Sequence, residues 1–220
     1  PCGAALGENC AQAFDRALEC DPDSAFGSII AFNRTLTAEA AREMAALFLE
    51  VVIAPDFEGP ALETLSRKRN VRLIRRPAVL PAVPALQVRA IEGALLLQER
   101  DDHRLAPEQS RTITVKAPGP REAADLQFAW RCVKHVKSNA IVIARDLRLL
   151  GVGAGQMSRV DSTRFAIQKA RQPLQGAVLG SDAFIPFRDT VDLAADAGIK
   201  AVIQPGGSIR DEEVTAAANE

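Results

Sequence analysis

A chain of 220 residues can bury a substantial core, and its length allows one large or two small domains. The composition is 47% hydrophobic and 25% charged, with a net charge of -1, which argues against the strongly basic surface of a nucleic-acid-binding protein. No apolar run reaches the roughly 20 residues that span a bilayer. We therefore expect a cytoplasmic protein with neither a nucleic-acid partner nor a membrane partner.

The first part of the chain alternates between helical periodicity and short apolar runs. Helices are predicted over residues 8–19, 38–49 and 59–68. Strands are predicted over residues 29–32, 51–54 and 71–74. Thr37 is placed to cap the second helix. This order favours parallel strands covered by helices.

Residues 77–120 are less regular. Prolines are mixed there with short extended runs at 94–97 and 111–115, which suits a connecting region better than a packed layer. Helical periodicity returns over residues 121–136. We therefore expect a boundary near residue 120.

The second half alternates strand and helix again. Strands are predicted over residues 140–144 and 200–204, and helices over residues 160–172, 190–197 and 211–219. Such alternation implies a mostly parallel sheet covered by helices, with ligands at the carboxyl ends of its strands.

The cysteines and histidines favour no metal site. The four cysteines are widely spaced and include no Cys-x-x-Cys pair, which supports neither a zinc site nor a disulfide framework. His103 and His135 each lack a partner at the spacing of metal ligands. We expect buried or incidental thiols and no transition metal.

Three polar or glycine-rich turns follow apolar runs in the second half, and they are the candidate site. The first contains Gly151-Val-Gly-Ala-Gly155, which is similar to a phosphate-binding loop because glycines let backbone amides approach an anion. It lacks the spacing of a dinucleotide fingerprint or a P-loop, so a structural turn fits it equally well. Arg159 offers a fork of donors for phosphate or carboxylate. Asn139 offers a carboxamide for an amine substrate, or it caps a strand.

The other two turns also leave alternatives open. Phe184 and Phe187 belong either to the core or to an apolar wall for a flat heterocycle. Asp189 lies at a helix N-terminus, where a carboxylate is favourable in any case. Ser208 either caps a helix or contacts a ligand. Spacing alone assembles no nucleophile, base and orienting acid, so these residues predict a small-molecule site of unknown chemistry.

Six motifs along the chain carry a family resemblance. They are Asp23-Ser-Ala-Phe-Gly27, Glu50-Val-Val-Ile-Ala-Pro55, Lys137-Ser-Asn-Ala-Ile-Val142, Gly151-Val-Gly-Ala-Gly-Gln-Met-Ser-Arg-Val160, Ser181-Asp-Ala-Phe-Ile-Pro-Phe-Arg-Asp189 and Gln204-Pro-Gly-Gly-Ser-Ile-Arg-Asp211. Together they resemble the bifunctional purine biosynthesis family PurH, which joins an IMP cyclohydrolase domain to a formyltransferase acting on the ribonucleotide AICAR. The resemblance covers essentially the whole chain.

The resemblance implies both a fold and a reaction. The fold would be two cytidine-deaminase-like α/β units, with mixed sheets covered by helices and a connecting region between them. Residues 1–120 would hold the first unit and the connector, and residues 121–220 the second unit, each incomplete at its outer end. The reaction would be formyl transfer from the cosubstrate 10-formyltetrahydrofolate to the 5-amino group of AICAR, in a homodimer with sites at the subunit interface.

The resemblance also assigns residues by position. Asn139 would match the family's active-site asparagine near the acceptor amine. The acceptor-nucleotide contacts would be Gly27, Glu50, Asn139, Arg159 and Phe184. The folate contacts would be Val160, Asp189, Ser208 and Ile209. A weakly nucleophilic amine must lose a proton as it attacks the formyl carbon, and Asn139 can orient that amine but is a poor base.

The chain also departs from the family's pattern. The family's Lys-His pair would precede residue 1, its C-terminal segment would follow residue 220, and the cyclohydrolase domain lies outside this sequence. Residues 184–186 read Phe-Ile-Pro, where the family commonly has Phe-Phe-Pro. We therefore expect weak binding and little or no formyl transfer by this chain alone. One rival is a non-catalytic nucleotide- or folate-binding module. The other, a dinucleotide oxidoreductase, is disfavoured by the glycine spacing.

Overall fold

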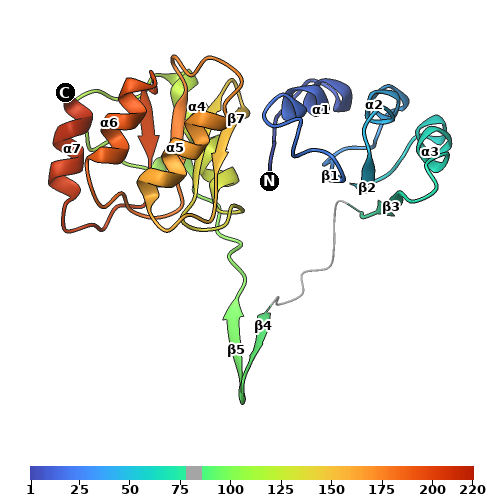
Figure 1. The fold of residues 1–220 in the computed structure, drawn as a ribbon, viewed down its shortest axis with the longest axis horizontal. Coiled ribbons are helices and arrows are strands. Elements are labelled where there is room, and N and C mark those ends of the chain that lie inside the picture. Colours follow the sequence, from blue (N-terminus) through green and yellow to red (C-terminus); the bar gives the residue numbers. More distant parts are fainter. Residues whose placement is uncertain (78–85) are drawn as a thin grey trace.

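The computed structural model describes residues 1–77 and 86–220 as a mixed α/β protein (Figure 1). These residues form a three-stranded sheet, a two-stranded hairpin and a four-stranded sheet. Helices pack on both of the larger sheets, so the predicted α/β class is confirmed. Within the described ranges, no helix is both long enough and apolar enough to cross a membrane.

The first sheet is parallel, as predicted. Its strands lie in the order β1 (Ser28–Ala31), β2 (Leu49–Ala54) and β3 (Arg72–Arg75). Its helices are α1 (Cys10–Leu18), α2 (Ala38–Met44) and α3 (Gly59–Ser66). The side chain of Thr37 accepts a hydrogen bond from the N–H of Ala40, which confirms the predicted cap. Helix α2 ends at Met44, not at residue 49, because main-chain turns lead the chain into β2 there.

Helices α1 to α3 cover one face of this sheet. Ile30, Val52 and Leu73 point into the core beneath them. On the opposite face, Ile29 and Ile74 are exposed. Parallel sheets are normally buried on both faces, so the three helices leave apolar surface uncovered.

A hairpin lies between the two larger sheets in sequence. Strands β4 (Leu86–Ile91) and β5 (Ala94–Glu99) pair antiparallel, and the hairpin projects away from the rest of the chain (Figure 1). A short 3-10 helix, η1 (Pro107–Gln109), follows. The predicted extended run at 94–97 is confirmed. The run at 111–115 forms no strand: residues 114 and 115 are bends, and the Val115 N–H donates to Asn219 Oδ1 at 2.8 Å. The predicted connecting region also includes residues 78–85, which lie outside the described residues.

The second sheet is mixed, with strand order β7-β6-β8-β9. Its strands are β6 (Ile141–Arg145), β7 (Arg148–Gly153), β8 (Val178–Ser181) and β9 (Ala201–Ile203). Its helices are α4 (Pro120–Val133), α5 (Arg159–Lys169), α6 (Asp189–Asp196) and α7 (Asp211–Asn219). Apolar side chains of α4 pack in one core cluster of this sheet, and those of α5 and α6 pack in another.

The expectation of a mostly parallel second sheet is wrong. Strand β6 pairs antiparallel with both β7 and β8, and only β8 and β9 are parallel. The cause is the tight turn at Asp146 and Leu147, whose φ angles of 55° and 57° fold β7 back on β6. The buried carboxylate of Asp125 holds this turn by accepting hydrogen bonds from both of its N–H groups, at 3.0 and 2.7 Å. Sequence patterns predicted neither β7 nor this turn.

The glycines predicted to form a loop lie instead inside β7. A Cβ on Gly151 would lie 2.1 Å from the carbonyl oxygen of Ala166, and one on Gly153 would lie 1.8 Å from that of Ser162. Both oxygens belong to α5, so these glycines let a helix backbone pass directly against the strand. The phosphate-loop interpretation is therefore wrong for Gly151 and Gly153, and the structural alternative holds.

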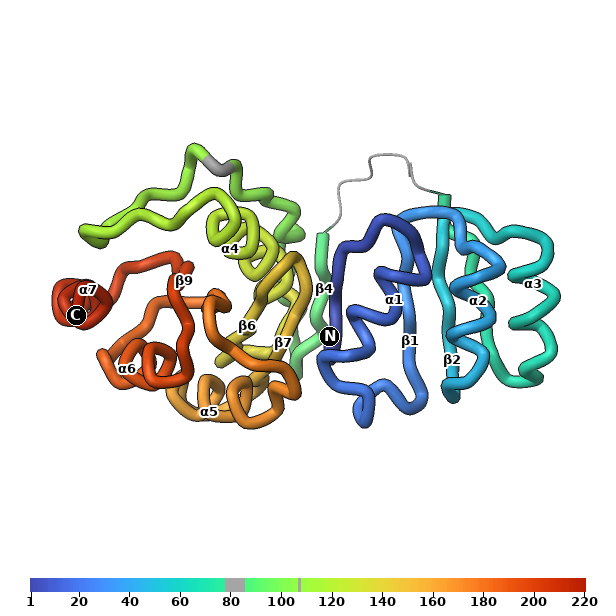
Figure 2. The backbone as a smooth tube through the Cα atoms, turned by 90° about the horizontal axis from the view of Figure 1, so that it is seen from above, coloured from blue at the N-terminus to red at the C-terminus, as the bar shows by residue number. Residues whose placement is uncertain are grey.

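Residues 4–6 join the first part of the chain to the second sheet. Leu6 N–H donates to Leu147 O and Leu149 N–H donates to Ala4 O, both at 2.9 Å, so this segment lies along β7 (Figure 2). Three ion pairs also connect the first part of the chain to the second: Glu19 with Arg148, Asp21 with Lys169, and Asp23 with Arg171. The N-terminal segment therefore belongs physically to both halves of the chain.

Candidate functional site

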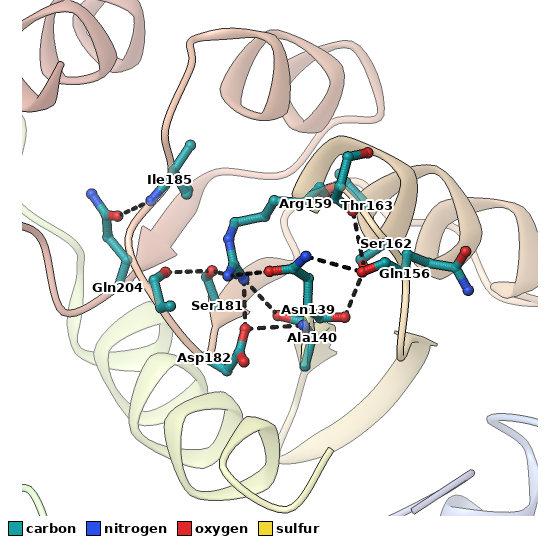
Figure 3. Close-up of polar contacts among 12 residues, drawn as sticks. Asn139, Ala140, Gln156, Arg159, Ser162, Thr163, Ser181, Asp182, Ile185 and Gln204 are labelled. Atoms are coloured by element: carbon teal, nitrogen blue, oxygen red, sulfur yellow. Dashed lines mark hydrogen bonds and ion pairs between the residues drawn. The ribbon is translucent and has the colours of Figure 1, made fainter. Parts of the chain in front are cut away.

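Four polar side chains converge at one edge of the second sheet (Figure 3). Asn139 lies two residues before β6 begins, and Arg159 is the first residue of α5. Ser181 ends β8, and Asp182 follows it directly. The fold thus brings together parts of the first two predicted turns.

Arg159 is the centre of this network. It is only 7% exposed, and its Nη1 donates to Asp182 Oδ1 at 2.5 Å, Ser181 Oγ at 2.9 Å and Ala140 O at 3.3 Å. Its Nη2 donates to Asn139 Oδ1 at 2.9 Å. A buried guanidinium requires such pairing, since an isolated charge is costly away from water. Arg159 therefore acts in this structure as an internal clamp on Asn139.

Asp182 is the counter-charge of this clamp. Burial alone raises the pKa of its carboxyl, but hydrogen bonds from Ser138, Arg159 and the Ala140 N–H, together with the Arg159 charge, lower the pKa below its usual value. Asp182 is therefore ionised at neutral pH and balances Arg159. A carboxylate that is paired with an arginine and has a lowered pKa is a poor general base.

The carboxamide of Asn139 has a fixed orientation. Its Nδ2 donates to Gln156 O at 2.9 Å and to Met157 O at 3.1 Å, which uses both of its protons. Its Oδ1 accepts from Arg159 and keeps a second acceptor position. The Asn139 carbonyl accepts a hydrogen bond from Ser162 Oγ at 2.8 Å, which ties it to α5. Asn139 can therefore accept a hydrogen bond from an N–H group in one defined direction.

The turn after β7 positions Asn139. The Gly155 N–H donates to Lys137 O at 2.8 Å, and Gly155 takes a φ of +69° that favours glycine. This contact holds the carbonyl groups of Gln156 and Met157 against Asn139. The glycine-rich turn thus contributes main-chain carbonyl groups that accept hydrogen bonds from the side chain of Asn139.

The second and third predicted turns also lie next to each other. Ile185 N–H donates to Gln204 Oε1 at 2.6 Å, and the guanidinium of Arg210 lies 4.8 Å from the ring centre of Phe187. Phe184 and Phe187 are both about half exposed, so neither is a full core residue. These rings leave apolar surface beside the two turns.

The predicted folate contacts have separate positions. Val160 lies in the first turn of α5, next to Arg159. Asp189 is exposed at the start of α6, where its Oδ1 accepts from the Thr190 N–H. Ser208 Oγ accepts from the Arg210 N–H at 3.1 Å, just before α7, while Ile209 is fully exposed. Ser208 supports this turn without being the N-cap itself, since that position is held by Arg210.

Glu50 lies on β2 and Gly27 directly precedes β1, so both belong to the first sheet's side of the chain, apart from Asn139. The Gly27 N–H donates to Phe48 O at 3.0 Å, and a Cβ on Gly27 would lie 3.9 Å from Glu50 Oε1. The rings of Phe26 and Phe48 lie 5.0 Å apart at the same place. The predicted acceptor-nucleotide residues therefore form two groups, one on each of the larger sheets.

Sequence patterns missed several parts of the network. Asp182 is separated from Arg159 by 23 positions, so no local spacing indicates their pairing. Ser162 was predicted only as part of a helix, yet it holds the Asn139 backbone. A carboxylate directly after an apolar strand was the one available hint of Asp182.

Two surface hollows lie away from this network. One of about 530 Å³ is found where α4 begins, and the other, of about 990 Å³, lies between α4 and the base of the β4–β5 hairpin. Neither hollow is lined by Asn139 or Arg159. Among the described residues, no group of three His, Cys, Asp or Glu side chains is placed to hold a metal ion.

The fold and the network define a mixed α/β protein in which a buried Arg–Asp pair orients one carboxamide at a sheet edge. The sequence model of a family described as AICARFT/IMPCHase bienzyme matches residues 1–169. The chain belongs to this family, and the predicted resemblance is confirmed.

Its curated relatives are longer proteins. The bifunctional purine biosynthesis protein PurH of Magnetococcus marinus is 52% identical over 233 residues, covering 100% of this chain and 44% of the relative. PurH proteins of Aquifex aeolicus and of a Chelativorans species are each 51% identical, with 100% of this chain and 43% of each relative covered. The chain thus spans less than half the length of these relatives.

Proposed function

We propose that this chain carries the formyltransferase part of a bifunctional purine-biosynthesis enzyme. Within the longer enzyme, it would take part in the transfer of the formyl group of 10-formyltetrahydrofolate to the 5-amino group of AICAR, in the cytoplasm and as a homodimer, while the chain alone would transfer little or none. Family membership supports a role in purine biosynthesis. The assignment to formyl transfer rests on the Asn139 network.

The observation that carries the proposal is the fixed Asn139 carboxamide, whose Oδ1 accepts one hydrogen bond from Arg159 and has the capacity for a second. An aromatic amine attacks an acyl carbon well only when its lone pair faces that carbon. A hydrogen bond from one amine N–H to a fixed oxygen sets this orientation. Because Gln156, Met157 and Arg159 hold the carboxamide on its other sides, the oxygen is positioned before any substrate binds.

The reaction forms one C–N bond and breaks another. The amine nitrogen attacks the formyl carbon and the carbonyl oxygen gains negative charge. The carbonyl then re-forms as the bond to N10 of the folate breaks, and the proton that the amine loses is balanced by one that N10 gains, which gives tetrahydrofolate. Asn139 orients the amine in this scheme. Removal of the proton needs a stronger base than a carboxamide, and Asp182 is committed to Arg159.

The two groups of predicted contacts are consistent with a shared site. Gly27 directly precedes β1 and Glu50 lies on β2, whereas Asn139, Arg159 and Phe184 belong to the second half of the chain. In the proposed homodimer, the first group of one copy would complete the site of the other. We also propose two deaminase-like units that divide near residue 120, since the order helix, strand, helix, strand, helix occurs in the first half as α1-β1-α2-β2-α3 and in the second half as α5-β8-α6-β9-α7.

The folate would bind at the neighbouring turns. Val160, Asp189, Ser208 and Ile209 would contact it beside the apolar surface of Phe184 and Phe187. Exposed Ile209 offers an apolar contact for a flat ring, and the Asp189 carboxylate suits a ring that donates N–H groups. The proposal includes no transition metal.

A hybrid enzyme tests the proposal. This chain would replace the matching segment of the Magnetococcus marinus relative, and formyl transfer would be followed by the release of tetrahydrofolate. We expect an active hybrid, a loss of at least 100-fold in kcat with Asn139→Ala, and little change with Gly59→Ala, which alters an open position in α3.

The outcomes separate the proposal from its alternative. A folded hybrid that binds AICAR and folate but transfers no formyl group would favour a non-catalytic binding module. Full activity of the Asn139→Ala hybrid would remove the role proposed for this carboxamide.

A further inference from the structure

The hollow between α4 and the base of the β4–β5 hairpin collects positive charge. Its volume of about 990 Å³ is large enough to hold a small molecule. The charged side chains that line it are four cations and two carboxylates: Arg100, Arg104, Arg131, Lys134, Asp101 and Asp102. With histidines counted as neutral, the lining has a net charge of +2, in a chain whose net charge is -1. A cleft with such an excess attracts anions.

Two of the four cations are committed to neighbouring groups. Lys134 Nζ donates to Asp101 O at 2.9 Å and to His103 O at 3.2 Å, and it lies 3.4 Å from the Asp101 carboxylate. Arg100 Nε lies 3.0 Å from Asp102 Oδ1. These contacts use both carboxylates of the lining, so the remaining two cations have no counter-charge within the hollow.

Arg104 and Arg131 are the two available cations. Both side chains are exposed, and within residues 1–77 and 86–220 neither guanidinium has an ion-pair or hydrogen-bond partner. A guanidinium presents paired N–H groups that match two oxygens of a phosphate. Both histidines of the chain, His103 and His135, line the same hollow and add ring nitrogens. The available donors therefore suit a phosphate group.

Other parts of the lining suit a flat heterocycle. Trp130 is the single tryptophan of the chain and is only partly buried, so its ring offers a surface on which a base can stack. Gln87 and Gln98 lie directly opposite each other in the hairpin register, which places their side chains side by side on one face. Their carboxamides have no hydrogen-bond partner in the part of the chain that the structure describes. A carboxamide offers both a donor and an acceptor, as the edge of a base requires.

We propose that this hollow binds a nucleoside monophosphate. Arg104 and Arg131 hold the phosphate, and Trp130 and the two glutamines hold the base. A phosphate monoester carries a charge of about -1.5 to -2 at pH 7, which matches the +2 of the lining. Asn139 and Arg159 do not line the hollow, so this site is separate from the acceptor contacts proposed above and does not depend on formyl transfer.

Trp130 reports binding directly, because the chain contains no other indole. AMP would be titrated into the whole chain while tryptophan fluorescence is excited where adenine does not absorb. Stacking on Trp130 should quench the emission, and calorimetry would measure the same dissociation constant without relying on the ring. We expect saturable binding with a Kd below about 1 mM. Inorganic phosphate alone and adenosine alone should each bind at least about tenfold more weakly, since each makes only part of the contacts.

Arginine variants locate the phosphate. Arg104→Gln and Arg131→Gln should each weaken AMP binding at least about tenfold, because each removes charge-assisted hydrogen bonds. Arg42→Gln replaces an exposed arginine on α2 and should change the Kd less than about twofold. Asn139→Ala should leave AMP binding unchanged. Urea unfolding would show that each variant keeps its fold.

Several results would overturn the proposal. One is the absence of saturable AMP binding by both fluorescence and calorimetry up to about 5 mM. Another is a Kd that Arg131→Gln and Arg42→Gln change equally. Equal affinity for inorganic phosphate and AMP would show an anion site with no contact to a base. A quench that Asn139→Ala abolishes would place AMP at the acceptor contacts. Failure of the hybrid enzyme to transfer formyl groups would leave the hollow's assignment intact.

Discussion

Replacement of Gly153 by alanine tests the contact that places α5 over β7. The new Cβ would lie 1.8 Å from the carbonyl oxygen of Ser162, and ordinary contact begins at 3.4 Å. Strand and helix must therefore separate by about 1.5 Å, and the obstructing atom is main chain that cannot rotate away. Overpacking of this kind costs about 3 kcal/mol. The shift also strains the hydrogen bond from Ser162 to Asn139, worth about 1 kcal/mol more.

Urea unfolding measures this cost directly. Trp130 is the single tryptophan and lies on α4 in the same half, so its fluorescence reports the transition. A loss of about 4 kcal/mol lowers the urea midpoint by about 1.3–2 M for a slope of 2–3 kcal/mol/M. Gly59→Ala is the control, because nothing lies within 4 Å of its Cβ, and we expect it to change stability by less than 1 kcal/mol. If Gly153→Ala unfolded within 0.5 kcal/mol of wild type, the close approach would be refuted.

Three further predictions concern buried groups. Arg159→Met leaves the Asp182 carboxylate without its cation and should lower the free energy of unfolding by about 3–5 kcal/mol. Adding Asp182→Asn should recover part of this loss, and urea unfolding of the wild type, both single variants and the double variant measures it. Because the folded-state pKa of Asp182 lies below its ordinary 3.8, the stability that it contributes is present above that pH and is lost as the pH falls through the folded value. The difference between wild type and Asp182→Asn should accordingly be flat from about pH 5 to 8 and shrink below about pH 4. Burial raises the pKa of Cys20 to about 12 and that of Cys132 to about 11, so a thiol reagent at pH 8 should label exposed Cys2 first and these two only on unfolding; rapid labelling in Cys2→Ser would contradict this.

Helices with clear apolar periodicity were predictable from the sequence. Helix α7 was predicted at its observed bounds of 211–219, and α5 and α6 within a few residues. Their signals are local, since each helix buries one face and carries its own start signal. The parallel first sheet followed from short apolar runs between such helices.

Strand β7 was not predictable because its glycines have a tertiary cause. Gly151 and Gly153 weaken any strand signal, and only the passage of α5 over them explains their presence. The turn at Asp146 and Leu147 was not predictable either, because it is also stabilised by a residue distant in the sequence. Its support comes from Asp125, which lies 21 and 22 positions earlier in the chain.

The candidate site was only half predictable. Asn139 and Arg159 stood out as polar residues beside apolar runs, and the fold brings them together. The hydrogen bond between them was not predicted, because Arg159 was interpreted as a donor of hydrogen bonds to a ligand. In the structure, its guanidinium donates instead to Asp182, Ser181 and Asn139. Residue type indicates which groups are able to bind an anion, and burial decides which of them remain available.

The joint between residues 4–6 and β7 bears on how the chain folds during synthesis. Leu6 hydrogen-bonds to Leu147, so the partner is made 141 positions later. At a synthesis rate of about 5–20 residues per second, Leu147 is added to the chain roughly 7–30 s after Leu6. Helices α1 to α3 and their sheet rely on contacts much closer in sequence and can form during that interval. Residues 4–6 would then pair with β7 after the first sheet has formed, and any slowing of translation before residue 147 would prolong the exposure of the unpaired segment.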